Sequence, residues 1–333
     1  MRTYLIMCCL FVCSWSFADY AIVIHGGAGT ITRKNITPEK EKEIKSALEE
    51  AVKLGAQLLS DGKTAIEVVE KVVMLMEDSP LFNAGKGAVF NHEGKQEMDA
   101  CIMDGKDLSV GAVAGVAHLK NPIVGARLVK DSTRHVMLSG KRAEGFCISK
   151  GAEYADSSYF FVKSRWDYLQ KVLEREKNQS GQNDGGAAYM DEGTLKYGTV
   201  GCVVVDKYGN LAAATSTGGL TNKKYGRIGD SPIVGAGTYA SNKSCAISCT
   251  GTGEFFIRGT IARDIAALME YKNLSLEEAG KETLQKLTEM KGDGGFIGVD
   301  GKGNVIMMFN TEGMYRGYTT HEMEKPVVKV YGD

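Results

Sequence analysis

The sequence has 333 residues, of which 43% are hydrophobic and 24% charged, and its 40 basic and 41 acidic residues leave a formal net charge of −1. This balance is typical of a globular chain with a sizeable core, and it gives no electrostatic reason to expect a nucleic acid or an anionic membrane as partner. Glycine is the departure from average composition, with 41 residues against 5 prolines and no collagen period. So many glycines indicate backbone that approaches ligands or turns through positive φ.

The first 18 residues, MRTYLIMCCLFVCSWSFA, have the pattern of a secretory signal peptide. A single basic residue precedes an apolar core, and a small-x-small site follows it, so we expect cleavage after Ala18 and a secreted or periplasmic protein. Lipidation at Cys13 is an alternative, although the bulky Phe11-Val12 before it does not suit a lipid-attachment box. No later apolar run reaches the ~20 residues that span a bilayer, so no membrane partner is expected once the signal is removed.

The next part of the chain alternates between strands and helices. We expect a short buried strand over 20–27 and an amphipathic helix over 38–60, with Pro38 in its first turn. A second helix is expected over 64–77. The glycine-rich passage LFNAGKGAVFN then leads into strands near 97–103 and 109–117. Helices over 122–131, 140–150 and 164–177 follow, and residues 178–198 have the composition of a flexible linker.

The last part of the chain predicts hairpins separated by helices. Strands are expected at 199–205, 211–216, 244–249, 294–299, 304–309 and 326–330, with helices at 254–272 and 275–290. The stretches VGCVVVDKYGNLAAAT and GGFIGVDGKGNVIMMFN predict two hairpins with Gly-Asn turns. Because helices lie between blocks of hairpins rather than after every strand, we expect antiparallel sheets with helices outside, an α/β layered sandwich.

Cysteine and histidine give neither a disulfide framework nor a transition-metal site. The five cysteines outside the signal segment are scattered through apolar runs, which is typical of buried small hydrophobes. The five histidines are dispersed, without an i, i+4 pair. His25 lies in IHGGAGT, which follows a strand but fits neither nucleotide-binding pattern, and a lone histidine there is more typical of a structural residue than of a base.

Thr199 is the most informative candidate nucleophile, because it stands between the linker-like segment and an apolar strand. A hydroxyl needs a base to become nucleophilic. If the Gly198–Thr199 peptide bond is cut, Thr199 gains an α-amine that is partly neutral near pH 7 and lies within reach of its own hydroxyl. Gly198 suits the strained conformation that an internal attack requires. The plainer interpretation, that Thr199 is a β-branched residue starting a strand, stays open at this point.

Two downstream stretches add to the case for a binding site. In TSTGGLTNKKYGRIGDSP, Arg227 and Asp230 share a loop; they suit an ordinary surface salt bridge, or a pair that holds the carboxylate and the ammonium of a zwitterion. In SCTGTGE, a strand ends just before a helix, and exposed N–H groups there suit an oxyanion hole. A simple helix N-cap by Thr252, with Glu254 in the first turn, is the alternative.

Together these motifs resemble the plant-type L-asparaginase/isoaspartyl peptidase (β-aspartyl peptidase) family of N-terminal nucleophile (Ntn) hydrolases. The match runs from about residue 20 to 330, and its pieces IHGGAG, LFNAGKGAVF, MDACIMDG, YGTVGCVVVD, the glycine-rich loop and SCTGTGE fall in the family's order. The resemblance implies a single four-layer αββα domain over 19–333. It also implies a precursor that cuts itself into 19–198 (α) and 199–333 (β), and a homodimer of the cleaved units.

The resemblance also implies residue roles and substrates. Thr199 would be the nucleophile in self-cleavage and in hydrolysis of L-asparagine and β-aspartyl dipeptides, and no cofactor would be needed. The other implied roles are Thr217 near the nucleophile, Asn83 close to it, Arg227 and Asp230 on the substrate α-carboxylate and α-ammonium, Thr250 and Gly251 as oxyanion hole, and Gly219 and Gly253 lining the pocket. The glycines of HGGAG would be the loop that shifts during maturation.

Many members also bind a structural alkali cation, such as sodium, through backbone carbonyls. Here the resemblance implies the carbonyls of Met76, Glu77, Ser79, Phe82, Ala84 and Lys86, oxygen donors that suit such an ion.

Two alternatives remain. A glycosylasparaginase-like amidase shares the sandwich but carries Asp before the cleaved Thr, where this chain has Gly198. An uncleaved amino-acid-binding protein would use Arg227 and Asp230 without turnover.

Overall fold

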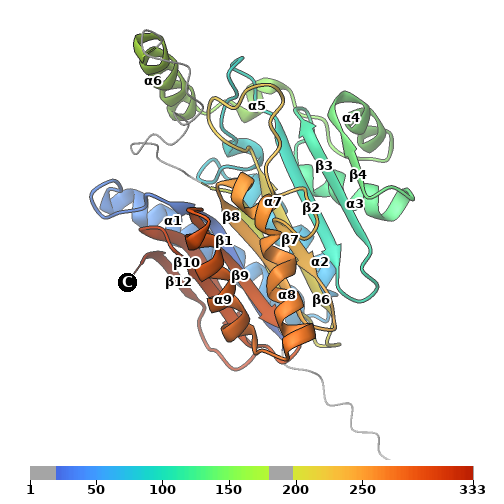
Figure 1. Cartoon of the computed structure of the whole chain (residues 1–333). Helices are drawn as coiled ribbons and strands as arrows, with labels where there is room; N and C mark the ends of the chain where they lie inside the picture. The colour runs from blue at the N-terminus through green and yellow to red at the C-terminus, as the bar shows by residue number, and fades with distance from the viewer. Residues whose placement is uncertain (1–19, 180–197, 333) are drawn as a thin grey trace, which may run out of the picture.

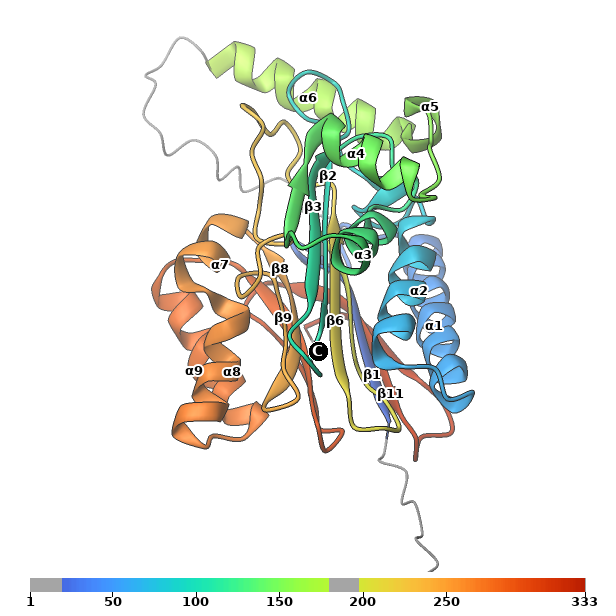
Figure 2. The same ribbon diagram turned by 90° about the vertical axis from the view of Figure 1, so that its right-hand side faces the viewer.

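Two β-sheets face each other, and helices cover the outer side of each, as Figure 1 and the perpendicular view in Figure 2 show. The computed structural model describes residues 20–179 and 198–332. The expected signal segment and nearly all of the expected linker lie outside the described residues. The four-layer αββα sandwich expected from the sequence is confirmed. Within the described part of the chain, no helix is both long and apolar enough to cross a bilayer.

The larger sheet has eight strands and the smaller four. The order in the larger sheet is β12 (Val327–Tyr331), β11 (Gly313–Thr320), β1 (Ala21–Gly29), β5 (Val200–Val205), β6 (Leu211–Thr217), β2 (Met98–Asp104), β3 (Val110–Val116), β4 (Met137–Ser139). The order in the smaller sheet is β10 (Val305–Phe309), β9 (Gly294–Asp300), β8 (Cys245–Gly251), β7 (Thr238–Ala240). The strand pairs are antiparallel except β3 with β4, which is parallel. The expected antiparallel sheets are therefore confirmed, with this one parallel pair at the edge as a departure.

Helices pack on the two outer faces. The larger sheet is covered by α1 (Pro38–Ser60), α2 (Ala65–Glu77) and α3 (Pro122–Ser132), and the smaller sheet by α7 (Gly253–Gly259), α8 (Ile261–Lys272) and α9 (Leu276–Glu289). The remaining helices are the 3₁₀ turn η1 (Gly85–Gly87), α4 (Gly140–Ser149), α5 (Ser157–Phe160) and α6 (Lys163–Gln179). Figures 1 and 2 both place α6 at one end of the sandwich.

The two long N-terminal helices begin where their capping residues dictate. Thr37 accepts the N–H of Lys40 at 3.2 Å, and Pro38 follows in the first turn. At the start of α2, Glu67 accepts the N–H of Thr64 at 3.0 Å in a capping box. Each such cap contributes about 1 kcal/mol to helix stability.

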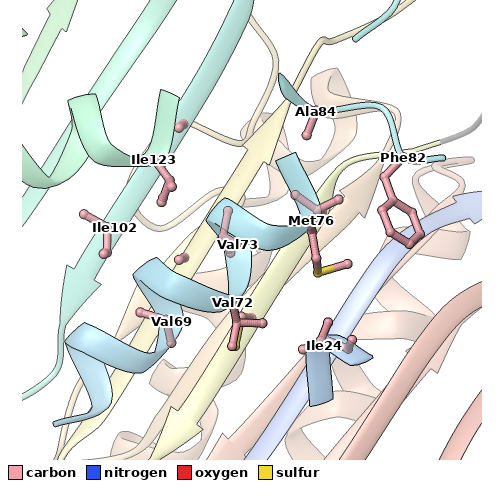
Figure 3. Packing of buried hydrophobic residues seen from close by; sticks show 14 of the residues in the cluster. Ile24, Val69, Val72, Val73, Met76, Phe82, Ala84, Ile102 and Ile123 are labelled. Carbon is pink, nitrogen blue, oxygen red and sulfur yellow. The ribbon is translucent and has the colours of Figure 1, made fainter. Parts of the chain in front are cut away.

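Burial of the apolar face of α2 holds it on the larger sheet. Figure 3 shows Val69, Val72, Val73 and Met76 of α2 packed among side chains of the sheet and of the following loop. Fully burying an apolar side chain of this size stabilises the fold by roughly 1.5–3 kcal/mol. This packing fixes the end of α2, and with it the loop that carries Asn83.

Both predicted hairpins are present, and their two loops have the same pattern of hydrogen bonds. In the β5–β6 hairpin, Asp206 Oδ1 accepts the N–H groups of Tyr208 and Asn210, each at 2.9 Å. In the β9–β10 hairpin, Asp300 Oδ1 accepts those of Lys302 and Asn304 at 2.9 and 3.0 Å. Each loop also contains a glycine at positive φ. The turns are therefore set by an aspartate together with the expected Gly-Asn.

The structure departs from the sequence-based expectation in two ways. The helix expected over 254–272 is broken at Thr260, which adopts a left-handed conformation with φ 47°, so that α7 and α8 are separate. Several short elements were not predicted: η1, β4, α5 and β7. The longer strand β11 was also missed, although it pairs with β1 along its whole length. Its sequence, GMYRGYTT, has two glycines and a buried Arg316 whose Nη1 donates to the carbonyls of Met314 and Tyr331 at 2.8 Å.

Candidate active site

Thr199 lies immediately before β5, with only 8% of its surface exposed. Its Oγ1 donates to Thr217 Oγ1 at 3.1 Å, and Thr217 Oγ1 also accepts the N–H of Gly219 at 3.0 Å. The carbonyl of Thr199 is 3.0 Å from His25 Nδ1. The hydroxyl and the backbone of Thr199 are thus held from different strands, β6 and β1.

Gly198 lies close to the backbone of β1 and to the hydroxyl of Thr250. A Cβ added to Gly198 would lie 2.6 Å from Thr250 Oγ1 and 2.8 Å from the Cα of Gly27. A Cβ added to Gly27, which has φ 112°, would lie 2.4 Å from the Gly198 nitrogen. Thr250 Oγ1 accepts the N–H of Ala28 at 3.3 Å. Two glycines therefore permit the HGGAG stretch to touch the residue before Thr199.

Asn83 acts on the turn that follows Thr217. Its Nδ2 donates to the carbonyl of Gly219 at 2.7 Å, and its Oδ1 accepts the N–H of Val89 at 3.0 Å. Gly218 N–H donates to the carbonyl of Asn83 at 3.0 Å. Gly219 has φ 77°, a conformation that favours glycine. Asn83 thus contacts Gly219 and the loop from which Thr217 receives its second hydrogen bond.

Arg227 and Asp230 both lie against Gly253, and they do not form the salt bridge with each other that was the plainer alternative. Arg227 instead makes a bidentate ion pair with Glu254, with Nε–Oε1 at 2.9 Å and Nη2–Oε2 at 2.8 Å. A Cβ added to Gly253 would lie 2.8 Å from Asp230 Oδ1 and 2.9 Å from Arg227 Nη2. Gly253 therefore leaves the room in which both charged groups approach the same backbone.

Asp230 is a buried carboxyl group with unused hydrogen-bonding capacity. It is 5% exposed, and its Oδ2 has no hydrogen-bond partner among the described residues. Burial raises the pKa of Asp230 to about 7, against smaller lowering effects that include the positive charge of Arg227. A cation that bound beside Oδ2 would compensate the cost of burying the ionised form.

Thr250 and Gly251 end β8, but their contacts differ. Thr250 Oγ1 is beside Gly198, as described above. Gly251 pairs with Gly294 of β9, and a Cβ added to it would lie 2.3 Å from the carbonyl of Asp293. Thr252 occupies the N-cap position of α7, and its hydroxyl donates to Asp293 Oδ1 at 2.5 Å. Of this motif, Thr250 contacts the Gly198–Thr199 junction.

His25 is the main residue whose placement the sequence did not indicate. Its side chain is fully buried, with Nδ1 near the Thr199 carbonyl and Nε2 2.9 Å from Ser248 Oγ. Burial lowers the pKa of His25 to about 3, and the hydrogen bond to Thr199 offsets this only in part. The imidazole is therefore neutral. The sequence signal that could have found this role of His25 is the presence of polar residues, such as Ser248, in strands that are otherwise apolar.

Buried ionisable groups near Thr217 were also missed. Asp99 lies directly opposite Thr217 in the β2–β6 pair, its Oδ1 accepts the N–H of Gly115 at 2.8 Å, and burial raises its pKa. Lys223 is 7% exposed, and its Nζ donates to the carbonyl of Glu97 at 2.6 Å. Glu77 accepts the Ser216 hydroxyl at 2.6 Å, and burial raises the pKa of Glu77 to about 8. An acidic residue inside an apolar strand, as in MDACIMD, is the sequence signal that could have found Asp99.

The backbone expected to hold an alkali cation curls around η1. A Cβ added to Gly85, which has φ 51°, would lie 2.4 Å from the carbonyl oxygen of Glu77, and one added to Gly87 would lie 1.9 Å from that of Phe82. Two of the six expected donors therefore converge on this turn, and carbonyl oxygens are the donors that hard cations prefer. Among the described residues, no group of three His, Cys, Asp or Glu side chains could hold a metal ion.

The chain is similar to known proteins over nearly all of its length. The profile of the asparaginase family matches residues 18–328. The isoaspartyl peptidases of Escherichia coli and Salmonella typhimurium are each 50% identical over 298 residues, covering 89% of this chain and 92% and 94% of theirs. The isoaspartyl peptidase/L-asparaginase of Danio rerio is 40% identical over 294 residues, covering 87% of this chain and 89% of its own. The chain belongs to the asparaginase family.

Proposed function

We propose that this protein is a self-cleaving threonine hydrolase that releases L-aspartate from N-terminal β-aspartyl dipeptides and from L-asparagine. The observation that carries the proposal is the setting of Thr199. It is a buried threonine whose hydroxyl bonds to Thr217 and which follows a glycine close to Gly27 and Thr250. The names of the relatives, isoaspartyl peptidase and isoaspartyl peptidase/L-asparaginase, support the same substrates.

Self-cleavage begins when Thr199 Oγ1 attacks the carbonyl carbon of Gly198. The new C–O bond forms an ester, the Gly198–Thr199 C–N bond breaks, and the hydroxyl proton moves to the departing nitrogen. Water then hydrolyses the ester, which leaves Gly198 with a carboxylate and Thr199 with a free hydroxyl and α-amine. The close approach of Gly198 to Gly27 and Thr250 supports this step, because it restricts the position of the scissile residue beside Thr199.

Hydrolysis of a substrate repeats the same chemistry on a new carbonyl. The α-amine of Thr199 accepts the proton of Oγ1 as Oγ1 attacks the side-chain carbonyl of the β-aspartyl group. The amine returns the proton to the leaving nitrogen, and an aspartyl ester remains on Thr199. Water attacks this ester and releases aspartate. We assign stabilisation of the oxyanion to Thr250 and Gly251, a role in which one donor typically contributes ~100–1,000-fold in rate.

Recognition of the substrate's α-amino and α-carboxyl groups falls to Asp230 and Arg227. Oδ2 of Asp230, which has no hydrogen-bond partner in the described part of the chain, suits an ammonium group. The guanidinium of Arg227 already holds a carboxylate, that of Glu254, in bidentate geometry. A substrate carboxylate would take the place of the Glu254 carboxylate. Gly253 leaves room beside both charged groups because it lacks a side chain, and we assign Gly219 to the lining of the same pocket.

The test compares the natural chain with Thr199→Ala and Thr199→Ser. The natural chain is expected to give two bands on a denaturing gel, with Thr199 at the N-terminus of the shorter fragment, and to hydrolyse both asparagine and β-Asp-Leu. Thr199→Ala is expected to remain one chain and to be inactive, while Thr199→Ser retains a hydroxyl and cuts itself more slowly. Cleavage of Thr199→Ala at Gly198 would refute the assignment. An uncleaved natural chain that binds aspartate without turnover would instead be an amino-acid-binding protein.

We also propose that the protein is exported. The support is the N-terminal sequence, with its apolar core and the small-x-small site before Asp19. We expect the longer fragment, purified from the producing cells, to begin at Asp19, which its intact mass would show. A fragment that begins at Met1 would contradict this proposal, and a lipid-modified Cys13 would favour the alternative.

A structural alkali cation and a dimer complete the proposal. The cation would be held by the carbonyls of Met76, Glu77, Ser79, Phe82, Ala84 and Lys86. It would stabilise the loop that carries Asn83, so exchange of sodium for a bulky organic cation is expected to lower the melting temperature. We propose a homodimer of cleaved units from the resemblance alone, and light scattering on the mature protein tests it directly.

A further inference from the structure

A chain of hydrogen bonds runs between the two sheets from the nucleophile to β7 of the smaller sheet. From Thr199 it passes through His25 of β1 to Ser248 of β8, which is 2.7 Å from Thr215 Oγ1 on β6. Thr215 Oγ1 is 2.6 Å from Thr238 Oγ1 on β7, where the chain of hydrogen bonds ends. The side chains of His25, Ser248, Thr215 and Thr238 are all fully buried. We call the last three, which carry hydroxyl groups, the relay.

The direction of the hydrogen bonds follows from the two ends of the imidazole. A carbonyl oxygen only accepts, so Nδ1 of His25 must carry the hydrogen that bonds to the Thr199 carbonyl. In a neutral imidazole Nε2 then accepts, so the hydroxyl of Ser248 donates to it. Ser248 has spent its only hydrogen, so it accepts from Thr215 at 2.7 Å, and Thr215 does not donate to the carbonyl of Gly237 at 3.4 Å. Thr215 in turn accepts from Thr238 at 2.6 Å, so Thr238 does not donate to the carbonyl of Ser231 at 3.1 Å. Each hydroxyl hydrogen of the relay therefore points toward His25.

Gly201 makes the His25–Ser248 contact possible. It lies directly opposite His25 in the β1–β5 pair. A Cβ at Gly201 would lie 2.0 Å from Ser248 Oγ and 2.3 Å from His25 Nε2. The backbone of Gly201 does not have positive φ, so the glycine is needed here for space rather than for conformation.

We propose that His25 is a positioning residue for the freed nucleophile, with its tautomer set by the Thr199 carbonyl and its ring held in place by the hydrogen bond from the relay of Ser248, Thr215 and Thr238. Once the Gly198–Thr199 bond is cut, Thr199 loses its tether on the N-terminal side. Its carbonyl remains bonded to His25 and its hydroxyl to Thr217. A chain end anchored at both groups keeps its amine and Oγ1 in reach of a substrate carbonyl, and misplacement by about 1 Å can cost ~100-fold in rate.

A pair of amide variants separates the two ring nitrogens. His25→Asn places its amide nitrogen near the position of Nδ1 and can still donate to Thr199, whereas His25→Gln reaches toward Ser248 and leaves the Thr199 carbonyl without this donor. In the cleaved protein we expect kcat to fall ~100-fold in His25→Gln and less than ~10-fold in His25→Asn, with KM little changed in both because Arg227 and Asp230 are intact. Equal kcat values for the two variants, high or low, would overturn the proposal.

The relay has its own matched pair of variants. Thr215→Val keeps the shape of the side chain but cannot donate to Ser248, and we expect kcat to fall about tenfold, the effect of one hydrogen bond. Thr283→Val is the control, because Thr283 is fully buried on α9 and its hydroxyl has no partner among the described residues. An unchanged kcat in cleaved Thr215→Val would show that the relay does not act on the nucleophile.

A spectroscopic measurement tests the inference without any activity. The proposed function underlies the kinetic experiments, but the tautomer of His25 is independent of it. Long-range ¹H–¹⁵N spectra of the natural protein labelled at histidine, with His25 assigned through His25→Asn, are expected to show a neutral ring protonated at Nδ1 between about pH 5 and 8. A hydrogen on Nε2, or titration within this range, would overturn the relay even in an active enzyme. If the ring is as expected but no substrate is hydrolysed, the proposed function fails instead.

Discussion

Arg227 holds Glu254 through two parallel hydrogen bonds, at 2.9 and 2.8 Å, in the place where a substrate carboxylate is proposed to bind. Glu254 belongs to the first turn of α7 and its side chain is half exposed, at 50%. The ion pair keeps the guanidinium oriented while the site is free of substrate. It also means that a substrate must displace a carboxylate that belongs to the protein.

The first prediction concerns this competition. Glu254→Gln removes the competing charge but keeps the length of the side chain, so the KM for asparagine is expected to fall by up to about fivefold with kcat little changed. The limit reflects an exposed ion pair, which contributes at most ~1 kcal/mol. Steady-state kinetics of the cleaved variant test this. A rise in KM would indicate that Glu254 mainly orients Arg227.

The second prediction concerns pH. The pKa of Asp230 is raised to about 7 by burial, so its carboxylate, the form that binds an ammonium group, is lost as pH falls through 7. We expect kcat/KM to decline below about pH 7 in the natural protein. Asp230→Asn should show a much lower kcat/KM and a shallower acidic limb, because only protonation of the Thr199 α-amine then remains to lower the rate. Its control is Asp107→Asn, on an exposed loop, and a limb of unchanged steepness in Asp230→Asn would assign the titration to another group.

The third prediction concerns maturation. Gly198→Ala brings a methyl group within 2.6 Å of Thr250 Oγ1, so we expect self-cleavage to slow strongly and precursor to accumulate. Gly27→Ala should be more severe, because Gly27 has φ 112° as well as a backbone contact at 2.4 Å. Gly209→Ala, at a positive-φ turn with open space, controls for the backbone effect alone. Time courses on denaturing gels measure the three rates, and similar rates for Gly198→Ala and the natural chain would contradict the close contact.

The fourth prediction concerns stability. Burial raises the pKa of Glu77 from 4.5 to about 8, so the folded protein keeps a proton that the unfolded chain releases near pH 4.5. The contribution of Glu77 to the free energy of unfolding therefore declines as pH rises from about 4.5 to 8 and is constant above. Glu77→Gln keeps an acceptor for Ser216 and lacks this decline. The melting temperatures of the natural protein and of Glu77→Gln should converge at the acidic end of this range, and the variant should be the more stable near pH 8. Parallel curves of melting temperature against pH would contradict the prediction.

The regular elements could be predicted because their signals are local. The helix expected over 38–60 has the observed bounds, since Thr37, Pro38 and an amphipathic pattern act within a few residues of each other. The hairpins at Asp206 and Asp300 carry their turn chemistry in five residues. β11 escaped prediction because its pairing with β1 is non-local, and its buried Arg316 is satisfied by carbonyls that only the fold supplies.

The site was predictable as a set of motifs but not as a set of contacts. The sequence order of the motifs pointed to Thr199, Arg227 and Asp230, and the structure brings Arg227 and Asp230 to the same glycine. The sequence could not show that Glu254 rather than Asp230 pairs with Arg227, because that choice depends on how α7 packs against the loop. His25 reads as an ordinary core residue until β1 is aligned with β5 and the smaller sheet is placed beneath it.

The strand order has a further consequence for the proposed two-fragment protein. β1, from the first fragment, lies between β11 and β5 of the second, and β2 borders β6. Figure 2 shows β1 beside β11. Strands of the two fragments are thus interleaved within one sheet. Neither could leave without breaking a complete ladder of hydrogen bonds on β1, so a cut at Gly198 would alter chain connectivity but not association. Once separated by denaturant, the two fragments would have to find each other again, and recovery of activity would depend on protein concentration.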